Sequence, residues 1–431
     1  MSLRFSKKLL VLLLAAALLR IVFSVFVVGW HAPPRGDEID YQALSANLAG
    51  GGGFALANGV ATARRPPCYP VFLAACYKLF GVHAAVGRVI QLILGVVVVL
   101  LVYIAAKQYF CERTAWIAAV LAAFNPFLIF ISGYLLTENL YMIFLFAFLI
   151  LFPFGRMLWE SPGRLVLASL LLALAALTRP TGFPFTVWVF AILLFAGSGP
   201  MRLRIARLSL MMVVWLIPFV PWVIRNQATF GKAILFTTHG GSTFYQGNNA
   251  AVRDIPRYHG GVAPLHALRD ESDRRSAGEV ENNREGWRKG LEFIKENPRD
   301  VPIMTWRKFL RFWRLRSDVG LSGVKSGWWW NQHSFLGKLA SSLDVGFAYA
   351  VLVLPFFLIG LGSACRRFAK FSLLHGVIVM HTLIALVFYG SLRSRIPIEP
   401  VIAIFASAGF MAVIERMRPA RSKEARVSRA V

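Results

Sequence analysis

Long apolar stretches, separated by short polar segments, recur along the chain from residue 8 to residue 414. Each holds roughly 17 to 25 residues, the length of α-helix that crosses about 30 Å of hydrocarbon. The predicted spans are 8–30, 84–106, 114–132, 138–155, 164–179, 182–197, 207–224, 344–363, 371–390 and 397–414. The pattern therefore predicts an all-α polytopic membrane protein with about ten transmembrane helices.

The composition agrees with this pattern and excludes a water-soluble domain of this size. Hydrophobic residues make up 57% of the 431 residues and aromatic residues 13%, which is too apolar for a soluble chain. The chain carries 47 Lys and Arg against 21 Asp and Glu, a formal net charge of +26. Part of this excess lies in short loops between spans, so it reports membrane orientation and needs no nucleic acid as an explanation.

The loops rich in Lys and Arg alternate along the ten predicted spans. They hold Arg4, Lys7 and Lys8; Lys107 and Arg113; Arg156 and Arg164; Arg202, Arg204 and Arg207; Arg366, Arg367 and Lys370; and six basic residues between 416 and 429. Such loops remain on the cytoplasmic side. We therefore predict a multi-pass membrane protein with both termini in the cytoplasm. The first apolar stretch is longer than a typical signal-peptide core, so we interpret it as an uncleaved anchor.

Two longer segments on the opposite, outward side divide the chain into three regions. Residues 1–224 form an N-terminal transmembrane bundle, whose first periplasmic loop is 31–83. Residues 225–343 form a second periplasmic region with an interfacial helix. Residues 344–431 hold the last transmembrane helices and a basic cytoplasmic tail.

Both periplasmic segments contain sequences with helical spacing. In the first, "DYQALSANL" places apolar side chains at Tyr41, Leu44 and Leu48, which predicts a short helix on the membrane surface. A second helix is predicted in "RRPPCYPVFLAACYKLF". In the other segment, "PIMTWRKFLRFWRLR" predicts an amphipathic helix with an aromatic face flanked by basic residues, which either touches anionic lipid or packs on the bundle itself. The Gly and Asn residues of "THGGSTFYQGNN" predict turns rather than a helix.

Several arginines lie at the outer ends of predicted spans, where short loops normally lack Lys and Arg. They are Arg64 and Arg65 before "PPCYP", Arg179 in "LTRPTG", Arg225 in "PWVIRN", and Arg393 and Arg395 in "SLRSRIP". A guanidinium group matches phosphate oxygens with two parallel hydrogen bonds. Any one of these side chains can reach a lipid phosphate by snorkelling, but the group as a whole indicates a shared site for an anion.

The scarce acidic residues on the same side lie in "RGDEIDY" and in "GYLLTENLY", where Glu138 begins the fourth span. Asp40 fits a helix N-cap better than Asp37 does, which leaves Asp37 and Glu38 without a structural explanation. A carboxylate that faces an arginine cluster suits substitution with a phosphate leaving group. The base takes the proton of the incoming group, and the cations stabilise the departing phosphate.

These considerations predict Asp37 and Glu38 as the catalytic residues. The predicted substrate- and phosphate-binding residues are Arg64, Arg65, Tyr41, Glu138, Arg179, Arg225, Arg393, Arg395 and His239. No cofactor follows with certainty from the sequence. A divalent metal ion is left open, with Glu38 and His239 as weak candidate ligands, since lone histidines are more often hydrogen-bonded bystanders.

Seven blocks of the chain, in order from about residue 35 to 400, resemble the bacterial GT-C membrane glycosyltransferases. They are "GDEIDYQALSANLAGGGGF", "RRPPCYPVFLAACYKLFG", "YLLTENLY", "AALTRPTG", "PWVIRNQATFG", "GGSTFYQGNN" and "RSRIPIEP". This broad group, which includes glycosyltransferase families 39 and 83, is related to protein O-mannosyltransferases and to the enzyme that adds aminoarabinose to lipid A.

The resemblance implies a polytopic fold with a periplasmic active site and an inverting transfer from a polyprenyl-phosphate-linked sugar. The acceptor would be a periplasmic lipid, glycan or protein. The family's first-loop catalytic carboxylate corresponds to Asp37, and its basic residue before "PP" corresponds to Arg65. Aminoarabinose enzymes typically carry Glu-Lys where this chain has Arg64-Arg65, and a basic residue where it has Asp40. These differences argue against an aminoarabinose donor.

Two other classes of function compete with the enzyme. A transporter or flippase for a lipid-linked glycan usually has charges or broken helices near the middle of the membrane, together with repeat symmetry. The sequence shows no convincing repeat, and Arg20 and Arg88 are the only plausible cations within the spans. A scaffold for envelope assembly leaves the outward arginines unexplained.

Overall fold

The computed structural model describes residues 6–152, 161–197, 199–264, 268, 278–315 and 345–417. Within these ranges the regular structure is helical, apart from an isolated antiparallel bridge between Ala55 and Ala61. The predicted all-α fold is therefore confirmed. The basic tail from residue 418, the loop with Arg156 and the end of the predicted span 138–155 lie outside the described residues.

The chain begins with helices that belong to the membrane bundle and to the loop 31–83. They are α1 (Lys7–Val22), which continues as a π-helix over Phe23–Gly29, α2 (Asp37–Ala49), α3 (Cys68–Phe80), α4 (Ala84–Tyr109), α5 (Glu112–Ala123), α6 (Pro126–Ile131), α7 (Glu138–Leu151), α8 (Pro162–Thr178) and α9 (Gly182–Ala196). The second part contains α10 (Met201–Leu216), α11 (Val220–Phe230), α12 (Gly240–Gly247), α13 (Ala250–Asp254), α14 (Glu279–Glu296), α15 (Val301–Trp313), α17 (Val345–Cys365), α18 (Phe368–Val387), α19 (Leu392–Arg395) and α20 (Glu399–Met417).

Six helical segments of the described chain are long and apolar enough to cross a membrane. They are Lys7–Gly29, Ala84–Tyr109, Met201–Phe230, Gly346–Cys365, Phe368–Val387 and Leu392–Met417. The predicted spans around α7, α8 and α9 fall on shorter apolar helices. These helices pack into one bundle, in which α7 lies against α4 and α8, and α20 lies against α5 and α17. The chain is a multi-pass membrane protein.

The predicted single span 114–132 was wrong, because the helix breaks between α5 and α6. The side chain of Asn125 accepts hydrogen bonds from the N–H groups of Phe127 (2.8 Å) and Leu128 (3.1 Å), which makes it an N-cap. Pro126 follows at the first helical position, where its missing N–H group matters least. On the other side of the break, Arg20 donates to the carbonyl oxygen of Ala123 at 3.2 Å. The buried Arg20 therefore satisfies the end of α5.

The prediction of turns in "THGGSTFYQGNN" was also wrong, since residues 240–247 form α12. Its glycines allow neighbouring backbones to approach closely. A Cβ atom at Gly241 would collide with the backbone of Asn283 in α14, and one at Gly247 would collide with the backbone of Phe388. Glycine disfavours an isolated helix, and here the close packing of α12 against α14 outweighs that tendency.

The amphipathic helix predicted near residue 306 is present as α15, which packs against α18. Its buried face consists of Met304, Lys308 and Phe312. Trp306 and Leu310 point away and are 54% and 49% exposed. Lys308 therefore does not flank the aromatic face at the surface, as the sequence had suggested, but lies inside the protein.

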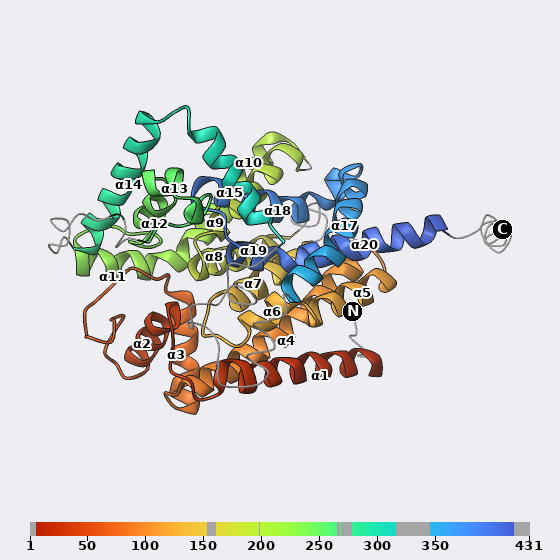
Figure 1. Cartoon of the computed structure of the whole chain (residues 1–431), viewed down its shortest axis with the longest axis horizontal. Helices are drawn as coiled ribbons and strands as arrows, with labels where there is room; N and C mark the ends of the chain where they lie inside the picture. Colours follow the sequence, from red (N-terminus) through yellow and green to blue (C-terminus); the bar gives the residue numbers. More distant parts are fainter. Residues whose placement is uncertain are drawn as a thin grey trace.

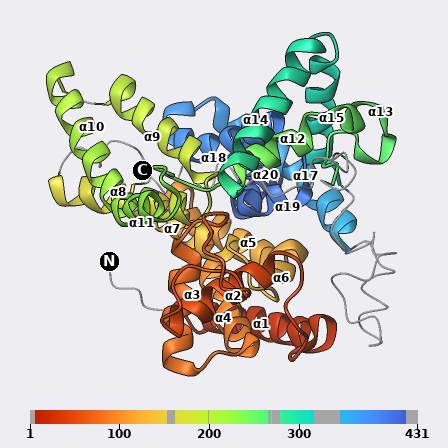
Figure 2. The same ribbon diagram turned by 90° about the vertical axis from the view of Figure 1, so that its left-hand side faces the viewer.

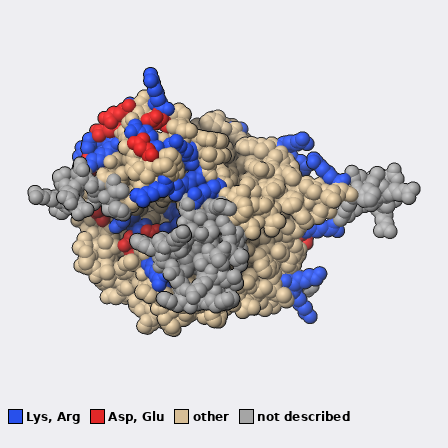
Figure 3. All heavy atoms as spheres, in the orientation of Figure 1, with Lys and Arg blue, Asp and Glu red and all other residues tan. Residues whose placement is uncertain are grey.

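The outer helices and the membrane helices occupy different parts of the molecule. In Figure 1, α2 and α3 lie at the left-hand end below, and α12 to α14 lie at the same end above, while α1 begins and α20 ends towards the right. Turned by 90°, the molecule shows α1 to α4 on one side and α12 to α15 on the other, with α19 and α20 between them (Figure 2). Charged side chains gather over the end that carries α12 to α14, next to a broad uncharged surface (Figure 3).

Candidate active site

The first helix of the loop 31–83, α2, begins at the acidic motif. Gly36 stands before it with a φ of +56°, a conformation that favours glycine, and makes no side-chain cap. Asp37 is therefore the first helical residue, and Asp40, which fitted an N-cap better than Asp37 by sequence, lies in the first turn instead. Asp37, Asp40 and Tyr41 follow a spacing of i, i+3 and i+4, which places them on one face of α2.

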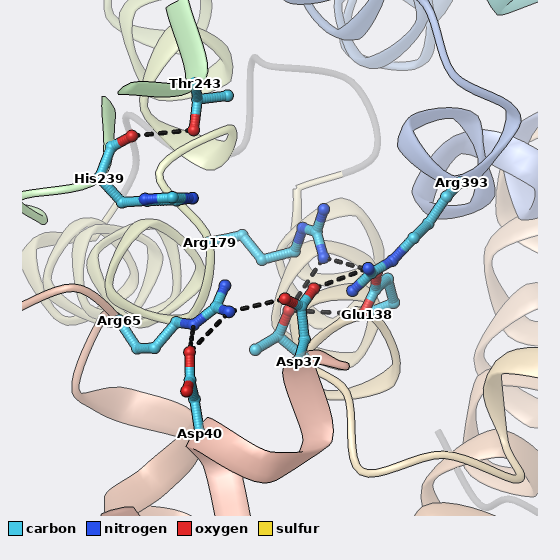
Figure 4. A network of polar contacts seen from close by, with 9 residues as sticks. Asp37, Asp40, Arg65, Glu138, Arg179, His239, Thr243 and Arg393 are labelled. Carbon is cyan, nitrogen blue, oxygen red and sulfur yellow. Dashed lines mark hydrogen bonds and ion pairs between the residues drawn. The ribbon is translucent and has the colours of Figure 1, made fainter. Parts of the chain in front are cut away.

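Asp37 links two arginines that come from distant parts of the sequence (Figure 4). Its Oδ1 lies 2.6 Å from Nη2 of Arg65, and its Oδ2 lies 2.7 Å from Nη1 of Arg393. Arg65 precedes α3, whereas Arg393 belongs to α19. Arg65 also donates from Nε to Oδ2 of Asp40 at 2.9 Å. The guanidinium group of Arg65 lies over the ring of Tyr41, 5.3 Å from its centroid.

A second carboxylate joins the same assembly from the start of α7. Glu138 is completely buried, and its Oε1 lies 2.8 Å from Nη1 of Arg179 and 3.1 Å from Nε of Arg393. Arg179 stands at the end of α8 and donates also to the hydroxyl of Thr137 at 2.9 Å. The first turn of a helix favours a negative charge, so the position of Glu138 complements its ion pairs.

Six side chains thus form one network, which we call the charge cluster. Its members are Asp37, Asp40, Arg65, Glu138, Arg179 and Arg393. They come from α2, α7, α19, the end of α8 and the segment before α3, so the fold brings together residues that are far apart in the sequence (Figure 4).

The electrostatics of the cluster favour the ionised forms of Asp37 and Arg65. Burial alone would raise the pKa of Asp37, but the charges of Arg393 and Arg65 outweigh it and hold this pKa below its usual range. For Arg65, burial acts to lower the pKa, and the neighbouring Tyr41 and Asp37 outweigh it, so the pKa of Arg65 is raised. While these pairs persist, Asp37 is a weak base.

His239 lies beside the cluster, immediately before α12 (Figure 4). Its backbone carbonyl accepts a hydrogen bond from the hydroxyl of Thr243 at 2.8 Å. Burial and the charges of Arg64 and Arg65 lower the pKa of His239 to about 4. The imidazole is therefore neutral at pH 7 and can offer one donor and one acceptor to a ligand.

The structure does not bring Glu38 to the charge cluster. Its Oε1 accepts a hydrogen bond from the N–H of Leu135 at 2.9 Å, and its Oε2 accepts one from the N–H of Arg35 at 3.1 Å. The carboxylate is buried, and burial raises its pKa. Glu38 thus fastens the start of α2 to two loops, which gives this acidic residue a structural explanation that the sequence did not offer.

Three of the predicted arginines also lie outside the cluster. Arg225 donates to the carbonyl oxygens of Thr62 and Phe54, each at 2.8 Å, and so holds the loop 31–83 on α11. Arg395 pairs with Glu399 at 2.8 Å inside the protein. Arg64 is exposed.

The sequence interpretation missed Asp40 and Thr137 as partners of the cluster arginines. The signal for Asp40 was its position on the same helical face as Asp37, and Thr137 gave none beyond its place next to Glu138. Among the residues that the structure describes, no three His, Cys, Asp or Glu side chains are grouped so that they could hold a metal ion. Glu38 and His239 therefore belong to no such group.

Comparisons with known proteins point to one fold. Residues 64–224 match the family model described as dolichyl-phosphate-mannose-protein mannosyltransferase, and no curated protein sequence is significantly similar to the chain. The structure of ArnT from Cupriavidus metallidurans in the apo state is 16% identical, with a TM-score of 0.56, over 97% of this chain and 61% of that one. The oligosaccharyltransferase AglB from Archaeoglobus fulgidus, solved with an inhibitory peptide and a dolichol-phosphate, is 16% identical, with a TM-score of 0.52, over 96% of this chain and 51% of that one.

The chain thus spans about half to three fifths of the length of these structures, and the match runs through nearly all of its own length. The likeness to ArnT and AglB agrees with the motifs between residues 35 and 400. The chain therefore has the fold of the GT-C membrane glycosyltransferases, as those motifs predicted.

Proposed function

We propose that this protein is an inverting glycosyltransferase that moves a sugar from a polyprenyl-phosphate donor to an acceptor on the periplasmic side of a bacterial inner membrane. The observation that carries the proposal is the placement of Asp37 between Arg65 and Arg393. A carboxylate next to paired guanidinium groups provides both a base and a site for a leaving phosphate. The matched family model is named for a transfer from dolichyl-phosphate-mannose, and AglB was solved with a dolichol-phosphate, which supports a lipid-phosphate donor.

In this proposal the acceptor hydroxyl attacks the anomeric carbon of the sugar from the face opposite the phosphate. The proton of the hydroxyl passes to the carboxylate of Asp37, and a new bond forms between the acceptor oxygen and the anomeric carbon. The bond between that carbon and the phosphate oxygen breaks, and its electron pair leaves with the polyprenyl phosphate. Arg65 and Arg393 stabilise the charge that grows on the departing phosphate.

The other parts of the chain have supporting roles in the proposal. Glu138 orients Arg393 and Arg179, so that their guanidinium groups keep their positions before the donor binds. His239, neutral at pH 7, contacts the sugar or the acceptor. The N-terminal region 1–224 supplies the base and two arginines, region 225–343 supplies His239, and region 344–431 supplies Arg393. The donor's apolar tail stays in the bilayer beside the spans.

The test is transfer by purified protein in nanodiscs, with a polyprenyl-phosphate sugar as donor and release of polyprenyl phosphate as the readout. Asp37→Asn should lower the rate by about 10²- to 10⁴-fold, the usual contribution of a general base. Glu112→Gln is the matched control. Glu112 is the first residue of α5, and it pairs with the exposed Lys107 of α4 and not with the charge cluster. Activity of Asp37→Asn within a few-fold of the wild type would remove Asp37 from the mechanism. Movement of the lipid without cleavage would favour a transporter instead.

A further inference from the structure

The charge cluster is already neutralised by the protein itself. Three guanidinium groups face three carboxylates, and all six groups lie within one network of ion pairs. With every member ionised, the cluster has no net charge. A phosphate that entered it unchanged would meet as many negative as positive groups, and binding would gain little from electrostatics.

The three carboxylates differ in how easily they can move. The side chain of Asp37 is 31% exposed, that of Asp40 is 19% exposed and that of Glu138 is fully buried. Asp37 is also the first residue of α2 and follows Gly36, whose positive φ marks a turn. A change in the side-chain rotamer there disturbs no helical hydrogen bond, because the first N–H groups of a helix have no partner within it.

The two oxygens of Asp37 occupy the positions that two oxygens of a phosphate would take. One faces Nη2 of Arg65 and the other faces Nη1 of Arg393. Guanidinium groups bind carboxylates and phosphates with the same fork geometry. The carboxylate of Asp37 therefore occupies the place between the two arginines that a phosphate would need.

We propose that the donor's phosphate displaces Asp37 from Arg65 and Arg393, so that binding of the donor itself releases the base. This inference rests on the proposed function. It makes donor binding and base activation one event, because the carboxylate that accepts the proton is set free only when the leaving group is in place.

The displacement changes the basicity of Asp37 in the useful direction. The paired arginines hold its pKa below the usual range. Once a phosphate takes over these arginines, their effect on Asp37 is largely neutralised, and the added negative charge nearby raises the pKa further. The freed carboxylate is then a better acceptor for the hydroxyl proton than the paired one.

Affinity for polyprenyl phosphate, without its sugar, tests the inference directly. The purified protein is placed in nanodiscs of zwitterionic lipid, and its dissociation constant is measured by titration. Asp37→Asn removes the internal competitor and should bind the phosphate at least tenfold more tightly than the wild type. Asp40→Asn removes the same charge near Arg65 but does not free Arg393, so it should tighten binding by no more than a few-fold. Glu112→Gln should leave the affinity unchanged.

Equal or weaker binding by Asp37→Asn would overturn the displacement, and so would equal gains for Asp37→Asn and Asp40→Asn, which would indicate a general charge effect. Asp37→Ser provides a second variant without the carboxylate and should repeat the gain. These outcomes are distinct from failure of the proposed function, in which the wild type itself would neither cleave the donor nor bind polyprenyl phosphate.

A separate set of contacts holds the loop between α18 and α19, the helix that carries Arg393. Lys308 of α15 is buried, and its Nζ donates to Oδ1 of Asn248 at 2.7 Å and to the carbonyl oxygen of Val387 at 3.2 Å. Asn248 donates to the same carbonyl from Nδ2 at 3.1 Å. Val387 is the last residue of α18, and the loop after it leads to α19.

The rest of this loop lies directly on the outer helices. The N–H of Gly390 donates to the carbonyl oxygen of Gly260 at 2.8 Å. A Cβ atom at Gly390 would collide with the backbone of Lys308. We infer that Lys308 is a positioning residue for Arg393: its ammonium group satisfies the C-terminal end of α18 and so fixes the start of the loop.

Lys308→Met tests this role, because Met keeps much of the volume and loses the charge. The expected result is a fall in kcat of about tenfold with the apparent unfolding temperature nearly unchanged, and Lys308→Arg should recover part of the loss. In an Arg393→Lys background the same change should have a smaller effect, since residues that act through one another are not additive. Met304→Ala, on the same buried face, controls for lost packing and should lower stability without this coupling. Additive effects of Lys308→Met and Arg393→Lys would overturn the inference.

Discussion

Arg393 and Arg395 both belong to α19, but their side chains have opposite environments. Arg393 is shared between Asp37 and Glu138, and its side chain is 26% exposed. Arg395 pairs with Glu399 at 2.8 Å and is only 4% exposed. It also donates to the backbone carbonyl oxygens of Phe312 and Arg314.

In the proposed mechanism, the difference separates an arginine that binds the phosphate from one that holds the fold. Arg393 has two carboxylate partners, one of them the partly exposed Asp37, which the proposal exchanges for the phosphate. Arg395 is buried, and its carboxylate partner Glu399 is buried as well, so loss of this pair would leave a buried charge without its partner. Net charge and position along the chain do not distinguish the two, and their contacts do.

The largest effect should come from breaking the buried ion pair between Arg395 and Glu399. Arg395→Ala leaves Glu399, which is 2% exposed, without a cation. Removal of one partner from a buried ion pair costs about 3–5 kcal/mol of stability. Thermal unfolding of the purified protein in detergent should therefore shift strongly downwards, together with the yield of folded protein. Replacement of both partners, in Arg395→Met with Glu399→Gln, should recover part of the stability, and a stable Arg395→Ala protein would contradict the structural role.

Substitution of Arg393 should show the reverse pattern, with a large loss of activity and a small loss of stability. Arg393→Ala should lower the rate of transfer by about 10²- to 10³-fold, the range found when a donor to a developing negative charge is removed. Stability should change less than in Arg395→Ala, because Asp37 keeps Arg65 and Glu138 keeps Arg179 as partners. The measurements are the rate of polyprenyl-phosphate release and the unfolding temperature of the same preparation. Equal losses of stability for the two variants would remove the distinction between them.

The pH dependence of stability should also reflect His239, which lies beside the charge cluster. Burial and two arginines lower the pKa of His239 to about 4 in the folded protein, whereas an unfolded histidine titrates near 6.5. Between these values the unfolded chain binds more protons, so stability falls as the pH drops from about 6.5 to about 4. The side chain is partly exposed, and we expect a loss on the order of 2 kcal/mol.

His239→Gln provides the comparison for this effect, because it removes the titrating ring. Unfolding temperatures measured at pH 7 and pH 4.5 should differ less in the variant than in the wild type. An identical pH response in both proteins would show that His239 is free to protonate in the folded state.

Much of the fold was predictable because apolar patterning is a local property of the sequence. The helices of the bundle and α15 follow directly from it. The break before Asn125 and the helix α12 were not predicted correctly. The first depends on a cap and on Arg20 from another helix, and the second depends on glycines that let two backbones meet. The contact from Arg20 and the approach of the two backbones are non-local features, whereas the cap at Asn125 and Pro126 was a local signal that the prediction did not use.

The sequence identified most of the residues that form the charge cluster, but it did not show which of the candidate residues lie together. The orientation rule selected the outward arginines, and the scarcity of acids selected Asp37 and Glu138. Two signals were available and not used: Glu399 follows Arg395 by four residues, a spacing that forms ion pairs on a helix, and Asp40 shares a face with Asp37. Whether an arginine joins the charge cluster, as Arg393 does, or pairs inside the protein, as Arg395 does, depends on contacts between distant segments. Local sequence patterns do not reveal these contacts.

The smallest effect in the comparison should come from Asp40→Asn. Asp40 pairs with Arg65 at 2.8 Å but does not touch Arg393, and its carboxylate remains partly exposed. Partly exposed ion pairs contribute about 0–1 kcal/mol, so kcat should fall by no more than about fivefold, with stability nearly unchanged. The assay that measures Asp37→Asn gives the comparison directly. A loss as large as that of Asp37→Asn would mean that the whole acidic face of α2 works as one unit, and the base could then not be assigned to Asp37 alone.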